Sequence, residues 1–262
     1  MKFLKLEKND HGIVRLTLNR PDVHNAFDDQ LIAEIDRALR DLAGDQAVRV
    51  LLLSGAGRSF SAGGDLNWMR RAADYGREEN RADADQLAAM MSALDRFPRP
   101  TVAVVNGAAF GGGVGLVAAC DVAIASERAV FSLSEVRLGL IPAVISPFVV
   151  NAIGQRAARR YFLSGERFDA STAERVGLVH EVAAHNELPH RVDALLQQLL
   201  AGGPSAQKTS KELLFRLRQK HDDEDPSAWT ARLIADVRAT EEAREGISAF
   251  LDKRKPLWAA DN

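Results

Sequence analysis

Two glycine-rich segments are the parts of this chain best suited to do chemistry. Residues 59–66 read SFSAGGDL, and residues 106–115 read NGAAFGGGVG. Glycine lets a ligand approach the backbone closely and permits positive φ angles, and the start of a helix offers unpaired N–H groups at a positive dipole end. Two such segments side by side would provide two convergent N–H donors, which is what a developing enolate or oxyanion requires.

Each segment, taken alone, also fits a structural turn or a phosphate-binding nest. Neither contains the Gly-Lys-Ser/Thr sequence of a nucleotide-binding P-loop. Neither matches the three-glycine dinucleotide fingerprint, because Gly55 and Gly57 lack a third glycine and Leu116 stands where the second segment would need one.

Strands and helices that alternate along the first two thirds of the chain would position these segments. Residues 13–18 alternate between two faces, and residues 48–53 and 101–105 are short apolar runs, which indicates strands. Apolar residues at helical spacing predict a helix from Leu31 that ends at Gly44, and each glycine segment leads into a further helix. This alternation favours an α/β fold.

The last third of the chain has a different character. From Ala152 onward the pattern is almost entirely helical, and the Gly-Gly-Pro sequence at residues 202–204 is the one plausible boundary. We therefore predict a core domain of residues 1–201 and a C-terminal helical oligomerisation region of residues 202–262, with two polar amphipathic helices.

Several further motifs occur in register with the glycine segments. They are LNRP at residues 18–21, NAF at 25–27, CD at 120–121, SEV at 134–136 and GLIP at 139–142. In order and spacing, the series resembles the signature motifs of the enoyl-CoA hydratase/isomerase (crotonase) superfamily, from about residue 10 to residue 256. The resemblance implies a spiral of ββα units that forms two near-perpendicular sheets, with C-terminal helices that build homotrimers and often homohexamers.

The resemblance also implies which residues bind an acyl-CoA thioester. The backbone N–H groups of Gly64 and Gly112 would form an oxyanion hole, and Glu135 would be the acid/base. Coenzyme A would be part of the substrate, so no separate cofactor is expected. The other implied substrate- and CoA-binding residues are Ala62, Asp65, Leu66, Ala143, Phe250 and Lys253.

Phe250 and Lys253 belong to the sequence FLDKRKP at residues 250–256. This sequence resembles the family's tail that reaches the CoA of a neighbouring subunit. A frayed, solvated terminus is the alternative interpretation.

The second carboxylate of the family's hydratases is missing here. By resemblance, one glutamate follows the triple glycine and one precedes GLIP, so that water can be activated and the α-carbon protonated. Glu135 fills the second position, but Gly115 stands at the first. A single carboxylate can still run hydration by handling both protons in turn, or isomerisation by moving one proton between the α and γ carbons. Judged from the residues alone, Glu135 beside Arg137 also fits a surface glutamate.

Three functions follow as hypotheses. The first is a 2-enoyl-CoA hydratase: residues 141–148 (IPAVISPF), with Gly115, look similar to bacterial methylglutaconyl-CoA-type hydratases of leucine and acyclic-terpene breakdown. Their branched substrates carry a second carboxylate, for which Arg70, Arg71 or Arg99 would supply a cation unless each is a solvated charge. The second is a Δ3,Δ2-enoyl-CoA isomerase, and the third a non-catalytic acyl-CoA- or RNA-binding protein of the same fold.

Composition and charge indicate which binding partners and which cellular compartment to expect. A formal net charge of −2 gives no broad attraction to nucleic acid or an anionic membrane, and no apolar window reaches the ~20 residues of a membrane span. The single cysteine, Cys120, and the lack of a signal-peptide pattern indicate the cytoplasm. The six histidines, His221 among them, show no paired ligand spacing, so no metal site is expected.

Overall fold

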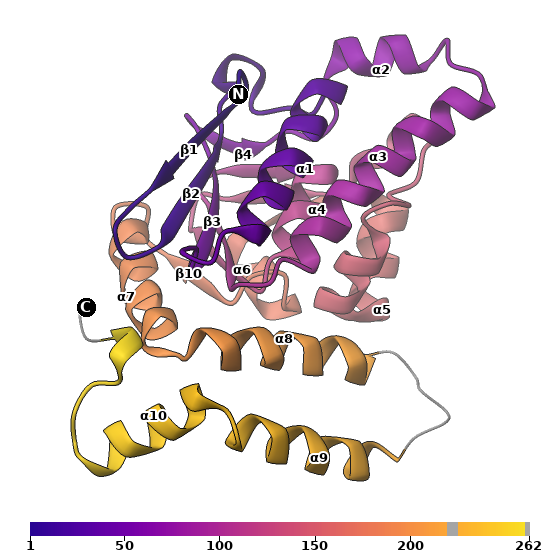
Figure 1. The fold of residues 1–262 in the computed structure, drawn as a ribbon. Coiled ribbons are helices and arrows are strands. Elements are labelled where there is room, and N and C mark those ends of the chain that lie inside the picture. Colours follow the sequence, from indigo (N-terminus) through magenta and orange to yellow (C-terminus); the bar gives the residue numbers. More distant parts are fainter. Residues whose placement is uncertain (219–224, 260–262) are drawn as a thin grey trace.

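The computed structural model describes residues 1–218 and 225–259, which form two sheets surrounded by helices (Figure 1). The larger sheet has the strand order β1-β2-β3-β5-β7-β10. Strands β1 and β2 form an antiparallel hairpin, and the remaining neighbours are parallel. Its strands are β1 (Leu4–Lys8), β2 (Ile13–Leu18), β3 (Val50–Gly55), β5 (Thr101–Val105), β7 (Val122–Ser126) and β10 (Glu181–Ala183).

The smaller sheet has the order β4-β6-β8-β9 and consists of three-residue strands. After each of β3, β5 and β7 the chain adds one short strand, so β4, β6 and β8 stack in the same sequence as their predecessors. This repetition is the predicted spiral of strand–strand–helix units. The strands are β4 (Ser59–Ser61), β6 (Ala108–Phe110), β8 (Val130–Ser132) and β9 (Arg167–Asp169).

Strand β3 shows why the larger sheet needs helices on both faces. Leu51 and Leu53 belong to the main core, whereas Val50 and Leu52 belong to a second core, as the two-residue period of a strand requires. The main core is covered by α1 (Asp29–Gly44), α3 (Arg77–Asp95), α4 (Gly112–Ala119) and α5 (Ser146–Ser164). The second core is covered by α7 (Leu188–Ala201).

Short helices connect these units, and two of them lie next to the predicted site residues. Helix α2 (Leu66–Ala72) starts directly after the first glycine segment, and the 3-10 helix η2 (Ser134–Leu138) contains Glu135. The other short helices are α6 (Ala170–Val176), η1 (Pro21–Val23) and η3 (Leu257–Ala259).

The C-terminal part forms a separate layer beneath the sheets (Figure 1). Its described residues form three α-helices, α8 (Pro204–Arg218), α9 (Pro226–Arg238) and α10 (Glu241–Leu251), so the prediction of two was wrong. The extra break has a local cause, because Thr240 caps α10 by accepting the Ala243 N–H (3.2 Å). The predicted division between residues 201 and 202 falls between α7 and α8, and the division into two domains stays a prediction.

Strands β9 and β10 were also missing from the prediction, which assigned this region to helices. Each has three residues and extends the edge of a sheet by pairing with a distant strand: β9 with β8 and β10 with β7. Their pairing is therefore tertiary, and a local pattern does not reveal it.

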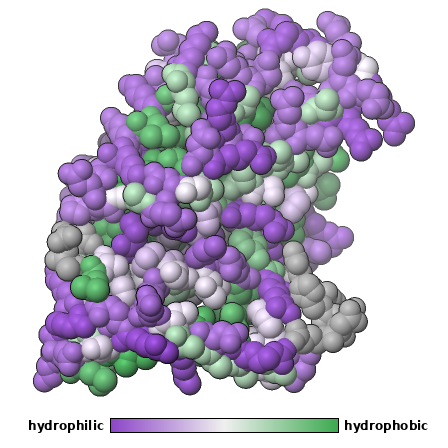
Figure 2. Space-filling model, viewed as in Figure 1, coloured by the Kyte–Doolittle hydropathy of each residue, from purple (hydrophilic) through white to green (hydrophobic). Residues whose placement is uncertain are grey.

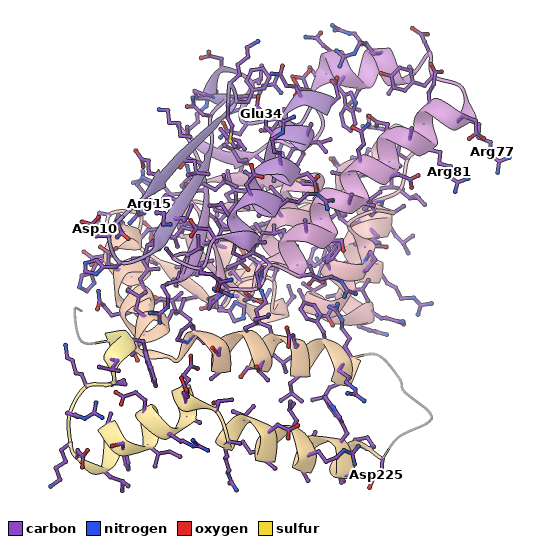
Figure 3. The ribbon with its side chains drawn as sticks, in the orientation of Figure 1. Asp10, Arg15, Glu34, Arg77, Arg81 and Asp225 are labelled. Carbon is purple, nitrogen blue, oxygen red and sulfur yellow. The ribbon has the colours of Figure 1, made fainter. Side chains whose placement is uncertain are left out.

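Hydrophilic residues cover most of the face shown in Figure 2. At the start of α3, Arg77 and Arg81 point outward, and Asp225 does so before α9 (Figure 3). Hydrophobic residues appear at the lower edge of the same face, where α9 and α10 lie (Figure 2). None of the helices among the described residues combines the length and apolar character needed to span a bilayer.

Cys120 follows α4 and is buried, as predicted for a core residue. Burial raises the pKa of its thiol far above the usual value, with a smaller contribution from the neighbouring Asp121 carboxylate.

Candidate functional site

The fold brings the two glycine segments into direct contact. Gly63 has a positive φ of 84°, and a β-carbon there would lie 2.9 Å from Phe110 O and 3.8 Å from Gly111 Cα. Gly63 and Gly111, which both have positive φ, therefore need to be glycine, since a side chain at Gly63 would push the two segments apart. The predicted side-by-side arrangement is thus present.

The N–H of Gly64 is left free by the way its neighbours are bonded. The Phe27 N–H donates to Gly63 O and Phe27 O accepts from the Asp65 N–H, both at 2.7 Å. In such a parallel bridge the N–H of the middle residue, here Gly64, points to the opposite side. Gly64 is exposed, so this donor is available to a ligand.

The N–H of Gly112 is free for a different reason. Gly112 is the first residue of α4, and the first N–H groups of a helix have no partner within it. The preceding Gly111 has a φ of 49°, and its own N–H donates to Ser132 O (2.9 Å). The dipole of α4 adds positive potential at the same place.

Phe27 connects the two donors, a role that the sequence pattern did not reveal. Its backbone forms the bridge at Gly64, and its buried ring packs under Gly112, where a β-carbon would lie 2.7 Å from Phe27 Cε2. One residue therefore fixes the spacing between the two N–H groups.

Glu135 lies against the same segment. A β-carbon at Gly111 would be 3.1 Å from Glu135 Oε1. The other carboxylate oxygen, Oε2, is buried and has no hydrogen-bond partner among the described residues. Burial raises the pKa of Glu135, and its own backbone N–H opposes that shift only in part. The side chain is therefore half-buried beside the two glycine segments and is not the exposed surface glutamate that was the alternative. Its role as an acid/base stays a prediction.

Buried polar side chains hold the backbone around the first glycine segment in place. Buried Asn25 donates from Nδ2 to Ala56 O (2.9 Å) and Ser59 O (2.8 Å), and its backbone has a positive φ of 56°. Arg20 donates to Ala26 O (2.6 Å) and contacts the Asp65 carboxylate at 3.0 Å. The LNRP and NAF motifs thus serve to place the segment.

The Asp65 side chain is used inside the protein. It accepts the N–H groups of Asn67 and Trp68 as the N-cap of α2, and it is buried. Burial opposes its ionisation, but these N–H groups and Arg20 outweigh that effect and lower its pKa. Any contact with CoA at Asp65 would therefore involve its backbone.

At Gly115, the space that a side chain would need is already filled by other residues. A β-carbon there would lie 2.3 Å from Ile145 Cγ2 and 3.1 Å from Met91 Cε. Ile145 and Met91 are themselves buried. Gly111 is the N-cap of α4 and Gly115 lies within its first turns, so Glu135 contacts the start of this helix and Ile145 contacts it four residues further on.

The other predicted contact residues lie on the surface of the single chain. Ala62 is half-buried and Leu66 is 71% exposed beside Gly64, and Ala143 is exposed on the connection from η2 to α5. Phe250 is 81% exposed at the end of α10, and Lys253 follows with a φ of 55°. Figure 1 shows α10 in the lower layer and α2, which directly follows the first glycine segment, at the other end of the molecule, so the tail and α2 lie far apart within one chain.

Of the three arginines considered for a second carboxylate, Arg99 is excluded. It is buried and donates to Val48 O, Pro98 O and Gln46 Oε1 at the far end of β3 and β5. Arg71 is paired with Asp29 (2.6 Å). Arg70, on α2, donates to the neutral Asn67 Oδ1 (3.0 Å) and keeps a charge that no described acid neutralises.

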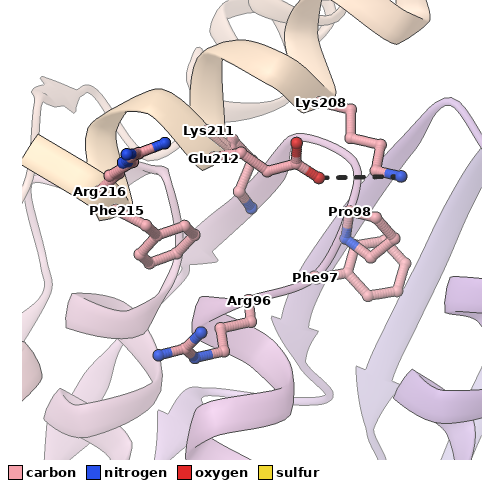
Figure 4. Close-up of a pocket in the computed structure, with 8 residues that line it drawn as sticks. All are labelled: Arg96, Phe97, Pro98, Lys208, Lys211, Glu212, Phe215 and Arg216. Atoms are coloured by element: carbon pink, nitrogen blue, oxygen red, sulfur yellow. Dashed lines mark ion pairs between the residues drawn. The ribbon is translucent and has the colours of Figure 1, made fainter. Parts of the chain in front are cut away.

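A pocket of about 470 Å³ lies elsewhere, between α8 and the segment that leads into β5 (Figure 4). Glu212 and Lys208 form an ion pair across its rim (3.8 Å), and no predicted site residue lines it. Its lining residues are Arg96, Phe97, Pro98, Lys208, Lys211, Glu212, Phe215 and Arg216.

No group of three or more His, Cys, Asp or Glu side chains is placed to hold a metal ion within residues 1–218 and 225–259. His221, which the sequence analysis included, lies outside the described residues.

Relatives with about one third identity have names that refer to different reactions. The 2,3-dehydroadipyl-CoA hydratase of Escherichia coli is 34% identical over 93% of this chain and 94% of its own length. The trans-2-decenoyl-[acyl-carrier-protein] isomerase of Streptococcus mutans is 31% identical over 98% of this chain and 99% of its own.

A family model described as enoyl-CoA hydratase/isomerase matches residues 8–261. A putative enoyl-CoA hydratase of Thermus thermophilus is 35% identical over 98% of this chain and 100% of its own length. The crystal structure of an enoyl-CoA hydratase from Shewanella pealeana superposes with a TM-score of 0.94 at 45% identity, covering 98% of this chain and 96% of that one. Sequence, fold and the paired glycine segments agree, and the chain is an enzyme that belongs to the enoyl-CoA hydratase/isomerase family.

Proposed function

We propose that this enzyme adds water to a 2-enoyl-CoA, with Glu135 as its single acid/base. The thioester oxygen would accept the N–H groups of Gly64 and Gly112. Negative charge grows on that oxygen when water attacks the β-carbon, so both donors bind the enolate more strongly than the substrate.

Glu135 would serve both proton transfers. Its carboxylate takes a proton from the water as the oxygen bonds to the β-carbon, and the resulting acid gives a proton to the α-carbon when the enolate collapses. The raised pKa suits this exchange, because a carboxyl that titrates nearer the working pH both accepts and donates more readily.

The observation that carries the proposal is the state of the Glu135 carboxylate. The half-buried side chain lies beside the two glycine segments, and its buried Oε2 has no partner among the described residues. Leaving a buried polar atom unpaired is costly, so such atoms point to a ligand or water that completes the site.

For the acyl group we propose a branched, 3-methylglutaconyl-like chain with a second carboxylate. Support comes from the missing side chain at Gly115, from Arg70 on α2, and from a relative named for a 2,3-dehydroadipyl thioester. A Δ3,Δ2-enoyl-CoA isomerase is the second candidate. The apolar Ile145 beside Gly115 favours it, since no second carboxylate holds a water there, as does the relative named an isomerase.

We further propose a homotrimer or homohexamer in the cytoplasm. Apolar side chains stay exposed on the C-terminal helices, among them Leu214, Ile234, Ile247, Phe250 and Leu251. Light scattering at micromolar concentration tests this, and a monomer would contradict it.

An absorbance assay of the conjugated thioester tests the reaction. The substrates would be crotonyl-CoA, 3-methylcrotonyl-CoA, 3-methylglutaconyl-CoA and a 3-enoyl-CoA. Water addition to the glutaconyl substrate, lost by at least ~100-fold in kcat in Glu135→Gln, is the expected result. Glu174→Gln, on the exposed face of α6, is the matched control. Turnover of only the 3-enoyl substrate would make the enzyme an isomerase, and unchanged turnover in Glu135→Gln would remove Glu135 from the mechanism.

A further inference from the structure

Trp68 lies beside one of the two oxyanion donors. It belongs to the first turn of α2, and a β-carbon at Gly64 would be 3.5 Å from Trp68 Cζ3. The six-membered ring of the indole thus reaches the residue whose N–H would bind the thioester oxygen. Trp68 is half-buried and packs against the main core with its remaining surface.

The opposite edge of the indole is held by α3. Trp68 Nε1 donates to Asp83 Oδ1 at 3.1 Å. Asp83 is half-buried and forms no ion pair with any described residue, although Arg71 and Asp29 lie close enough to affect it electrostatically. Partial burial of a carboxylate is costly, and this one accepts a hydrogen bond from the indole N–H alone among the described residues. This indicates that Asp83 serves to fix the orientation of the Trp68 ring.

Further along α3, the same helix face reaches α4 at Gly115. Asp83, Leu87 and Met91 are spaced by four residues, the first two half-buried and Met91 fully buried. Met91 reaches Gly115 together with Ile145. Trp68, Leu87, Met91 and Ile145 therefore belong to or pack against one apolar cluster, which meets Gly64 at Trp68 and Gly115 at Met91 and Ile145.

We propose that the Trp68 indole is a wall of the acyl-binding site, and that Asp83 is a positioning residue that fixes this ring. The planar enoyl group of a 2-enoyl thioester would lie against the indole, a large apolar surface with a preference for flat partners. The inference rests on the proposed function only in placing the thioester oxygen between Gly64 and Gly112.

Tryptophan fluorescence with butyryl-CoA, a saturated and unreactive thioester, gives a direct test. The chain has three tryptophans, Trp68, Trp229 and Trp258. Binding is expected to change the emission of the native protein. The change should disappear in Trp68→Phe, with binding still detected by calorimetry, and persist in the control Trp229→Phe, on α9. A response that survives in Trp68→Phe would overturn the proposal.

Asp83 is tested by a double-mutant cycle. Asp83→Ala should raise KM for the enoyl thioester roughly 10-fold with a smaller change in kcat, as expected when a wall of a binding pocket loosens. Asp83→Asn keeps the accepting oxygen and should stay near the native KM. In the Trp68→Phe background, which lacks most of this contact, Asp83→Ala should add little. An equal effect of Asp83→Ala in both backgrounds, or a loss of thermal stability with KM and emission unchanged, would contradict a positioning role.

Failure of the inference and failure of the proposed reaction are distinguishable, because butyryl-CoA binding requires no turnover. An emission change that depends on Trp68 in a protein with no hydratase or isomerase activity would support the wall and refute the reaction. Turnover without any contribution of Trp68 to emission or KM would support the reaction and refute the wall.

Discussion

The region around the two glycine segments and the layer formed by α8, α9 and α10 are stabilised in different ways. Around the segments, backbone hydrogen bonds and buried side chains fix the backbone, with Phe27 contacting both Gly64 and Gly112. In the layer, α8 and α9 have no buried residue and α10 has only Ala249.

Individual polar contacts attach this layer to the core. Arg49 donates to the carbonyl oxygens of Leu200, Gly202 and Trp258, and Lys211 contacts Asp121 at 2.7 Å. The difference indicates that the positions of the two N–H groups are set within the core, while apolar side chains of the layer stay exposed. Five predictions follow from this comparison.

The largest expected effect concerns the donor at Gly112. Gly112→Ala would place a β-carbon 2.7 Å from the Phe27 ring, so the ring or the donor must move. We expect kcat to fall about 100-fold, as for the loss of one oxyanion donor. Gly44→Ala is the control, since nothing lies within 4 Å of its β-carbon. Steady-state kinetics check both, and a native kcat in Gly112→Ala would show that the donors are not tightly positioned.

The next effect is the pH dependence of catalysis. Burial raises the pKa of Glu135, so kcat/KM should rise with pH through a value above the usual glutamate pKa of about 4.3 and level off above it. Below that value the carboxyl is protonated and the rate should fall about tenfold per pH unit. This fall in rate at low pH should be absent from the residual activity of Glu135→Gln. A fall at the ordinary value would mean that Glu135 is solvated in the working enzyme.

Stability should show the opposite trend. A raised folded-state pKa means that the native protein binds more protons than the unfolded chain between the two pKa values, so the stability contributed by Glu135 falls as pH rises through that window. Glu135→Gln removes this cost, and urea unfolding at neutral pH should find the variant at least as stable as the native protein.

A smaller effect is expected where Gly115 meets Ile145. Gly115→Ala should destabilise the fold by about 1–3 kcal/mol, because the added methyl overlaps Ile145 Cγ2. Combining it with Ile145→Ala makes room, so the double variant should lose less than the sum of the single changes. Urea unfolding measures the cycle, and strict additivity would show that the two side chains do not compete for space.

The smallest effect is expected in the C-terminal layer. Lys211→Met removes one charged contact, but Asp121 still accepts from Thr101, so we expect a loss of about 1 kcal/mol and an unchanged kcat. Lys208→Met, in the exposed pair with Glu212, should change stability by less. If Lys211→Met lowered kcat as strongly as Gly112→Ala, the layer would be part of the catalytic geometry and the separation would fail.

Much of the site could be predicted because its parts are local. The glycine segments, the N-cap before α2 and the start of α4 are each set by a few consecutive residues. Phe27, Trp68 and Ile145 act through contacts with segments far along the chain, and a single aromatic or aliphatic residue in a sequence does not say which distant backbone it will meet. Arg99 was misjudged for the same reason, since only the fold shows that carbonyl groups surround it.

Cys120 has a practical consequence. The thiolate is the species that reacts with alkylating labels, and the one cysteine of the chain is buried with a raised pKa. A cysteine introduced at exposed Phe250 and another at exposed Leu66 should therefore take a spectroscopic label in the otherwise native sequence. Distances between such labels on mixed subunits would test the proposed assembly, in which the tail of one protomer reaches the glycine segments of another.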